Sequence, residues 1–342
     1  MPGQSKATSR HTRLRLPGRR GLSLWLLLAA GFYIAWLANS GTDTLTAALG
    51  RLGATGFLLL LACSLANYLL RFARWQFYLQ HLGHAVPPAR SLAYYIAGFA
   101  LTTTPGKAGE TVRSLYLYRH GVPISTSLSV FFTERFLDLV VMGLISLLAL
   151  LMLPGYGFLL FVVGSFFLVI LALMFSHPTL QRLAWLGDRF LPARLNRLFR
   201  HLLELLHDAR RLFQPAPILR GMGLGLAAWL TQALAFHFLL LQLGFAIPLH
   251  TSLAIYAIGI LGGALSMIPG GIGATETGMA VLLGSVGAPP AVALSAPLII
   301  RMATLWFAVS LGFISSGLLA LGRDTPAEAV LPVAQKEVDR RR

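Results

Sequence analysis

Long apolar runs constrain the fold of this chain more than any other feature of its sequence. Of its 342 residues, 56% are hydrophobic and 12% carry a charge, which is about half the charged share of a soluble domain. Several runs reach the roughly 20 apolar residues that a helix needs to cross a bilayer. Because the bilayer core offers no water to backbone N–H and C=O groups, these runs must be helical. The sequence therefore predicts an all-α polytopic membrane protein.

The apolar runs and the charges between them divide the chain into a membrane domain with two polar ends. A basic arm, 1–20, precedes a transmembrane domain at 21–322, and a polar tail follows at 323–342. Leucines at helical spacing alternate with arginines over 178–213, which indicates a basic amphipathic helix on the cytoplasmic membrane surface. A solvated helix packed on the protein's own loops is the alternative for this stretch. We expect full spans at 22–39, 54–70, 124–153, 157–175, 217–243 and 291–321. The second span is expected to end at Arg71 and Arg74, which then lie with Arg90 in a cytoplasmic loop.

Two further apolar segments are broken in the same way. Each is a short apolar run that stops at a Pro-Gly pair and resumes with an acidic residue at membrane depth. The first comprises 91–103 and 109–120, and the second comprises 251–267 and 272–287. The proline and glycine end the helix at this point. Broken helices in matching places of two halves are typical of the midplane binding site of a transporter.

The distribution of arginines orients these segments. With the N-terminus inside, a single crossing by 91–120 would put the Arg-rich stretch 178–213 outside, against the positive-inside rule. We therefore expect two re-entrant helical hairpins that enter from opposite faces and point at each other. They form an inverted-repeat-like arrangement within about eight membrane segments, and both termini are then cytoplasmic. Two ordinary spans in each pair would give the same loop orientation, so this alternative stays open.

Composition also bears on partners and location. The net charge of +16 comes from basic residues in loops beside apolar spans, so we expect no nucleic-acid partner. The single cysteine, Cys63, excludes an internal disulfide. Short loops and the low acidic count favour a bacterial inner membrane. Trp25, Trp36, Trp75 and Tyr78 fit an aromatic belt at the membrane interface.

Charged side chains at membrane depth supply the candidate site. Each costs at least about 2.5–3.5 kcal/mol to insert, so each needs a partner or a purpose. The cations would neutralise an anionic head group, and the acidic residues would hold those cations in the empty site or take up protons. The glycine-rich breaks expose helix N-termini, which also suit a phosphate. A structural ion network is the alternative for Glu134, Arg135 and Asp138. We predict substrate binding by Pro105, Gly106, Lys107, Gly109, Glu110, Arg113, Glu134, Arg135, Asp138, Pro269, Gly270, Gly271, Gly273, Glu276 and Arg301.

The order and spacing of these residues resemble the lysylphosphatidylglycerol synthase transmembrane family over roughly 20–322. The resemblance implies a polytopic inner-membrane protein that translocates lipids or lipid-linked glycans between leaflets. In larger members a cytosolic aminoacyl transferase domain follows the membrane domain. This chain is too short to hold one, so we expect no synthase activity. The motifs that carry the resemblance are Pro105-Gly106-Lys107-Ala108-Gly109-Glu110 with Arg113, Thr133-Glu134-Arg135 with Asp138, and Pro269-Gly270-Gly271-Ile272-Gly273 with Glu276.

We therefore expect a protein that flips an anionic phospholipid or a polyprenyl-phosphate lipid between leaflets, without a cofactor or a metal. A membrane-embedded lipid head-group transferase, or its accessory subunit, is one alternative, with Glu110 or Glu134 as the general base. An ion-coupled small-molecule transporter is another. Membrane lipids are the expected partners. A homo-oligomeric state and a lipid-modifying enzyme as a further partner both stay open.

Overall fold

The computed structural model describes two long stretches of the chain, 42–147 and 210–322, and the isolated residues 31, 165, 185, 188–189 and 192. Every regular element in the two stretches is a helix, and no strand occurs in them, as the apolar runs predict. Several predicted elements lie outside the described residues. They are the arm 1–20, the spans 22–39 and 157–175, nearly all of the amphipathic helix 178–213, and the tail 323–342.

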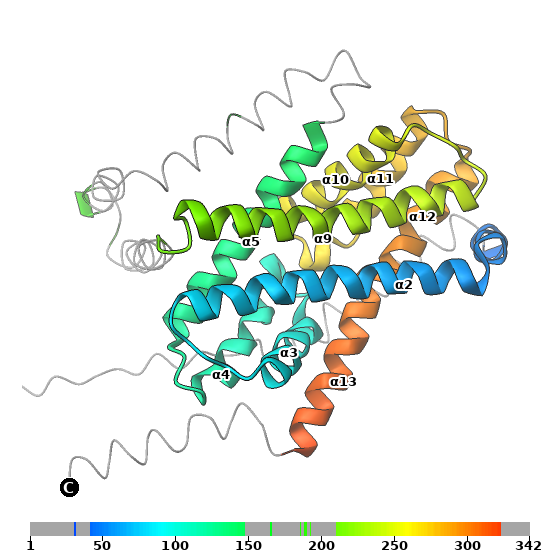
Figure 1. Ribbon diagram of the computed structural model, residues 1–342. Coiled ribbons are helices and arrows are strands. Elements are labelled where there is room, and N and C mark those ends of the chain that lie inside the picture. The colour runs from blue at the N-terminus through cyan, green and yellow to red at the C-terminus, as the bar shows by residue number, and fades with distance from the viewer. Residues whose placement is uncertain are drawn as a thin grey trace, which may run out of the picture.

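Two long antiparallel helices form the frame of the protein. The helices α2 (Thr42–His81) and α9 (Pro215–Gln242) lie side by side and run in opposite directions (Figure 1). Both are long and apolar enough to cross a membrane. A third helix, α5 (Ile124–Ser146), packs against both of them. The helix α2 extends far beyond the predicted span 54–70, so its second half carries functional groups that the sequence assigned to a loop.

A continuous helical stretch closes the described part of the chain. It begins with α12 (Pro290–Arg301), passes through a π-helical turn, η5 (Met302–Trp306), and ends with α13 (Phe307–Leu321). The stretch agrees with the span predicted at 291–321, and it is also long enough to cross a membrane. Its first part packs on α2 and α9, whereas α13 begins beside α2, where Phe307 contacts Tyr68, and then leads away toward the lower edge of Figure 1.

The first broken segment folds back on itself. Tyr94 and Tyr116 stack with ring centroids 5.1 Å apart, and the Tyr94 hydroxyl lies 3.1 Å from Nε2 of His120. The two arms of the segment therefore lie side by side, and the chain returns to the end from which it came. The arms and the break are α3 (Pro88–Ala97), η1 (Gly98–Leu101), η2 (Pro105–Val112) and α4 (Arg113–Tyr118).

The second broken segment folds back in the same manner, and the two breaks meet. Its arms pack closely because glycine lets them approach: a Cβ on Gly259 would lie 2.5 Å from the Met279 side chain. The break η4 contacts the break η2 of the first segment. The elements are α10 (Leu249–Leu265), η4 (Pro269–Gly271) and α11 (Ala274–Ser285).

Four loops of the same chemistry bracket the two broken segments. In each loop a glycine with φ between 76° and 87° ends one helix, and a proline caps the next helix. The residue after each glycine donates its N–H to the carbonyl five residues earlier, which is the Schellman arrangement. Glycine reaches this φ without steric cost. The glycines are Gly83, Gly121, Gly244 and Gly287, and the prolines are Pro87, Pro123, Pro248 and Pro289.

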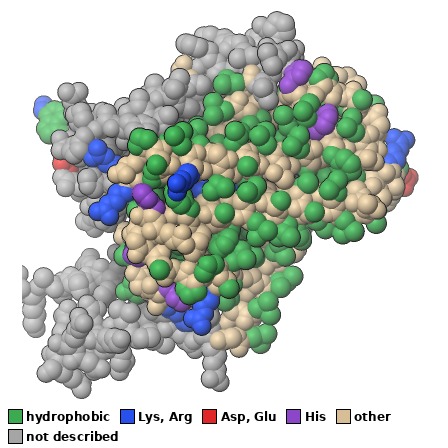
Figure 2. All heavy atoms as spheres, viewed as in Figure 1, with side chains coloured by type: hydrophobic (Ala, Val, Ile, Leu, Met, Phe, Trp, Pro, Cys, Tyr) green, Lys and Arg blue, Asp and Glu red, His purple; other side chains and the backbone are tan. Residues whose placement is uncertain are grey.

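The surface agrees with a membrane location, but two of the four residues predicted for the aromatic belt do not belong to it, and Trp25 and Trp36 lie outside the described residues. Figure 2 shows hydrophobic side chains over the middle of the long helices, with charged side chains gathered toward their ends. Trp75 and Tyr78 are buried rather than interfacial. The reason is that α9 covers this part of α2: Gly221 leaves room for the Tyr78 hydroxyl, which lies 1.7 Å from the position of an added Cβ.

The contact between α13 and η1 depends on a single glycine. A Cβ on Gly312 would lie 2.1 Å from the backbone nitrogen of Ala100. We predict that Gly312→Ala lowers the free energy of unfolding by about 1–3 kcal/mol, because the added methyl group must displace backbone. Gly317→Ala on the same helix is the control, since nothing lies within 4 Å of its Cβ position. Thermal unfolding in detergent measures both, and equal melting temperatures would contradict this close packing.

Candidate functional site

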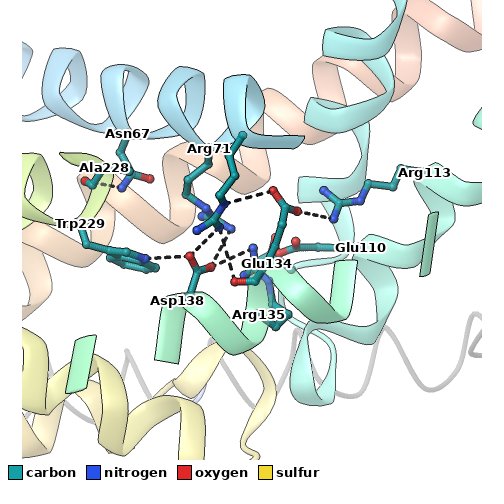
Figure 3. Close-up of polar contacts among 11 residues, drawn as sticks. Asn67, Arg71, Glu110, Arg113, Glu134, Arg135, Asp138, Ala228 and Trp229 are labelled. Atoms are coloured by element: carbon teal, nitrogen blue, oxygen red, sulfur yellow. Dashed lines mark hydrogen bonds and ion pairs between the residues drawn. The ribbon is translucent and has the colours of Figure 1, made fainter. Parts of the chain in front are cut away.

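A cluster of buried charges joins α2 and α5 around one carboxylate. The Asp138 carboxylate accepts a hydrogen bond from Arg74 at 2.7 Å, and it pairs with Arg135 at 3.1 Å and with Arg71 at 3.7 Å (Figure 3). The indole N–H of Trp229 donates to the same carboxylate at 3.0 Å, which attaches α9 to the cluster. Each buried charge thus has a partner of opposite sign, as burial requires.

A second carboxylate extends the cluster to α4. Glu134 pairs with Arg113 at 2.8 Å and with Arg74 at 3.6 Å. The Arg113 guanidinium also lies over three aromatic rings, the nearest at 3.7 Å from the ring centre. Cation–π contacts of this kind hold a desolvated arginine in place. Arg113 therefore anchors α4 to α2 and α5. The three rings belong to Trp75, Tyr95 and Phe131.

The second break is held by an ion pair of its own. Arg301 on α12 pairs with Glu276 on α11 at 2.9 Å, and its Nη2 donates to the carbonyl of Gly270. The other oxygen of Glu276 accepts the N–H of Gly273 at 2.7 Å, so Glu276 caps its own helix. A carboxylate of the protein thus already occupies the position at this helix start where the sequence predicted an external phosphate.

The first break is closed by threonines. Thr102 donates a hydrogen bond to the buried Glu110 carboxylate at 3.0 Å, and the Gly109 N–H donates to the Thr104 hydroxyl at 2.6 Å. These contacts bring the chain on either side of Pro105 together. The side chains at 105–108 lie outside the description, so the predicted ligand Lys107 stays a prediction.

A cavity of about 340 Å³ lies where the two halves meet. This volume is in the range of small-molecule binding sites. Three apolar side chains that line it, Phe132, Met267 and Ile268, are also exposed, so the cavity reaches an apolar surface. Met267 has φ 55°, a left-handed conformation that is strained for a side chain of this size. The lining residues with polar side chains include Asn67, Tyr68, Arg71, Thr102, Glu110, Arg135, Asp138, Gln232, Tyr256, Thr275, Arg301 and Thr304.

The predicted residues separate into two groups. One group lines the cavity, and the other holds the surrounding helices in place behind it. Lining residues are Glu110, Arg135, Asp138, Gly270, Gly271 and Arg301. Residues behind the cavity wall are Gly109, Arg113, Glu134, Pro269, Gly273 and Glu276.

Sequence reasoning missed the cationic face of α2. We expected the second span to end at Arg71 and Arg74, on the cytoplasmic side, but both are buried within the helix. The signal was their spacing: Asn67, Arg71 and Arg74 are four and three residues apart, so they form one polar stripe on an apolar helix. Trp229 and Gln232 on α9 line the same cavity, and the sequence around them shows no comparable polar stripe.

The cluster carries more positive than negative charge. Within the described stretches, four arginines stand against three carboxylates, so one positive charge is not balanced there. An unbalanced charge away from water is costly, and an anion that enters the cavity relieves this cost. Arg301 and Glu276 pair separately and cancel. The arginines are Arg71, Arg74, Arg113 and Arg135, and the carboxylates are Glu110, Glu134 and Asp138.

Comparisons with known proteins agree with this architecture of a membrane protein. Residues 22–312 match the model of the family described as the lysylphosphatidylglycerol synthase TM region. A UPF0104 membrane protein of Methanothermobacter thermautotrophicus is 27% identical over 229 residues, which cover 62% of this chain and 68% of that protein. A UPF0104 membrane protein of Methanocaldococcus jannaschii is 21% identical over 313 residues, which cover 86% of this chain and 93% of that protein. Both relatives are archaeal.

The ion pairs of Glu134 allow a direct test of the cluster. We predict that Glu134→Gln lowers the free energy of unfolding by about 3–5 kcal/mol, because it leaves Arg113 buried without a carboxylate. Asp43→Asn, at an exposed position in the first turn of α2, should change it by no more than about 0.5 kcal/mol. Thermal unfolding in detergent, followed by the loss of helical circular dichroism, compares them. A Glu134→Gln protein as stable as the wild type would show that the cluster does not hold these helices.

Proposed function

The chain belongs to the lysylphosphatidylglycerol synthase transmembrane family, as its motifs predict, and on this premise we propose that it moves an anionic lipid between the leaflets of its membrane. The lipid is a phospholipid or a polyprenyl-phosphate lipid. Its head group passes through the cavity between the two breaks, while its tails stay in the bilayer. One observation carries this proposal: the cavity combines an excess of positive charge with an opening at an apolar surface.

Arg71 is the proposed ligand of the phosphate. It lines the cavity, and its contact with Asp138 is the longest of the three that this carboxylate makes with arginines. Within the described stretches its Nε and Nη2 make no hydrogen bond. A guanidinium with free donors can grip a phosphate with two parallel hydrogen bonds. A phosphodiester carries one negative charge, which matches the one unbalanced positive charge of the cluster.

The apolar opening supports a lipid over a soluble substrate. Phe132, Met267 and Ile268 line the cavity and are also exposed at the surface of the protein. Apolar side chains at the surface pack favourably against lipid tails, whereas a soluble ion that enters between them loses part of its hydration shell at a cost in free energy. A head group can thus enter from the side of the protein with its tails still in hydrocarbon.

We also propose that the two broken segments are re-entrant hairpins that enter from opposite faces. Their arms are short: α10 has 17 residues and α11 has 12, below the roughly 20 that a span requires. The described arginines Arg90, Arg210, Arg211 and Arg220 lie near the loops of the first hairpin, where α2 ends and α9 begins. The positive-inside rule makes this face cytoplasmic. A bacterial inner membrane with cytoplasmic termini is the setting we propose.

Two other functions have some support from the same cavity. Its volume of about 340 Å³ would also accept a small solute, as in an ion-coupled transporter. The Glu110 carboxylate in its wall could act as a general base in a lipid head-group transferase, alone or as an accessory subunit. The excess positive charge and the apolar opening favour lipid movement over both.

Lipid movement can be tested by neutralising one arginine. We predict that Arg71→Gln slows leaflet-to-leaflet movement of labelled anionic lipid in proteoliposomes by at least about tenfold, since a charge-assisted hydrogen bond contributes about 1.5–3 kcal/mol. Arg51→Gln, at an exposed position outside the cavity and before the kink of α2 at Gly53, should move lipid within about twofold of the wild-type rate. Uptake of a solute without lipid movement would favour the transporter, and chemical conversion of the labelled lipid would favour the transferase. Unchanged movement with Arg71→Gln would contradict the phosphate site.

The fold-back of each broken segment predicts which positions share a membrane face, and this pairing is the same for re-entrant hairpins and for two full spans in each segment. In a Cys63→Ser background, single cysteines are introduced at four exposed loop or helix-end positions. We predict that Ala85→Cys and Ser125→Cys react with an impermeant maleimide from one face, whereas Ala246→Cys and Ser285→Cys react from the other. Each hairpin returns the chain to its own face, which gives this pairing. Labelling of Ala85→Cys and Ser125→Cys from opposite faces would contradict it.

A further inference from the structure

Met267 is the one residue other than glycine that has a positive φ in the described stretches. Its φ of 55° is the left-handed conformation, in which Cβ of an L-residue lies too close to the following carbonyl oxygen. Such strain persists only where surrounding contacts enforce it, and it is concentrated at ligand clamps and switch regions. Met267 lies in the loop 266–273, which joins α10 to α11 and contains the second break. The contacts that hold this loop therefore bear on its function.

One arginine holds the loop in place. Nη2 of Arg301 donates a hydrogen bond to the carbonyl of Gly270, and Nε of the same guanidinium pairs with Glu276 at 2.9 Å. Within the loop, Gly271 donates its N–H to the carbonyl of Ile268 at 2.8 Å, so this turn moves as one piece. Arg301 therefore fixes the turn that directly follows the strained residue.

The same guanidinium lines the ligand cavity, together with the loop that it holds. Met267 is 62% exposed and Ile268 is 43% exposed, and both also line the cavity, so the loop lies where the cavity reaches the surface. An anion within reach of Arg301 competes with the Gly270 carbonyl for Nη2. The anion is the stronger acceptor, because its charge adds an electrostatic attraction that a neutral carbonyl lacks.

We propose that Arg301 is a positioning residue that couples the arrival of an anionic head group to a movement of the loop 266–273. In the described conformation, its hydrogen bond to Gly270 keeps Met267 left-handed. An anion that takes over this donor lets Met267 relax to a negative φ, which moves the side chains of Met267 and Ile268 at the exposed side of the cavity. The inference rests on the proposed entry of an anion and adds the conformational step that follows, whichever lipid enters.

A spin label on the loop can follow this movement. In a Cys63→Ser background, a nitroxide is attached at Ile268→Cys, and its mobility is recorded in detergent by electron paramagnetic resonance. Saturating dioctanoyl phosphatidylglycerol should raise the mobility by at least about twofold, because a loop freed from its hydrogen bond gains motion on the nanosecond timescale. Dioctanoylglycerol, which has the same tails and no phosphate, should leave it unchanged. A label at Leu265→Cys, exposed at the end of α10 outside the cavity lining, should respond to neither.

Two substitutions of Met267 isolate the strain. Glycine adopts a φ of 55° without cost, whereas alanine retains the cost, and both remove the rest of the side chain. The label at Ile268→Cys should therefore respond to dioctanoyl phosphatidylglycerol in Met267→Ala and should not respond in Met267→Gly. Met267→Gly should also unfold at a higher temperature than Met267→Ala, because its folded state is free of this strain.

A conservative substitution of Arg301 tests the coupling. Lysine keeps the positive charge but lacks the planar fork with which Arg301 reaches both Glu276 and Gly270. In Arg301→Lys, the label at Ile268→Cys should be as mobile without the lipid as it is in the wild type with it. A role confined to stability would lower the melting temperature and leave the response to the lipid intact.

The outcomes separate this inference from the proposed function. An unchanged label in the wild type, equal responses of Met267→Gly and Met267→Ala, or a wild-type response of Arg301→Lys would overturn the inference and leave lipid movement in place. A wild type that shows the loop response but moves no lipid in proteoliposomes would overturn the proposed function and leave the inference in place. The two Met267 variants keep the test decisive if Arg301→Lys fails to fold.

Discussion

The described fold depends on the ion pairs and the hydrogen bond that the Asp138 carboxylate makes with residues of three helices. Three arginines and one indole converge on this carboxylate, from α2, α5 and α9, so it determines how these three helices lie against one another. The approach is close enough that α9 has a glycine at the crossing: a Cβ on Gly225 would lie 2.7 Å from the Arg74 guanidinium. Desolvation makes such a cluster costly to build and costlier to break, so the helices are held in one register. The cavity lies on the side of this cluster that contains Arg71, the arginine with the longest distance to the Asp138 carboxylate.

The two halves of the protein repeat one plan with opposite charges. In each half, the returning arm of the broken segment is tied to the next helix by an ion pair. In the first half Arg113 on the arm meets Glu134, and in the second Glu276 on the arm meets Arg301. The halves differ in what surrounds the pair. The first half adds a cationic face of α2, whereas the charges of Glu276 and Arg301 in the second half cancel each other, so the attraction for an anion comes from one side of the cavity.

The sequence predicted the elements better than it predicted the contacts. Periodicity and breakers identify the helices and both broken segments, because these depend on neighbouring residues. The predictions for Arg71, Arg74 and Trp75 were wrong because the positive-inside rule treats an arginine after an apolar run as the end of a span, whereas α2 continues to His81. Arg113 was predicted to bind the head group, yet it lies in an aromatic cage whose rings come from three helices. Such an environment depends on residues far apart in the chain, which no local pattern reveals.

The π-helical turn at Met302–Trp306 links two helices, each of which packs on one of the broken segments. Before it, α12 packs on the second segment; after it, α13 packs on the first. A π turn holds one extra residue, so it rotates the packed face of a helix between its two ends. The turn itself borders the cavity through Thr304 and Leu305. The helices α12 and α13 therefore pack on both segments, with the π turn between them at the cavity. A shift of either segment has to bend this turn or displace the other segment.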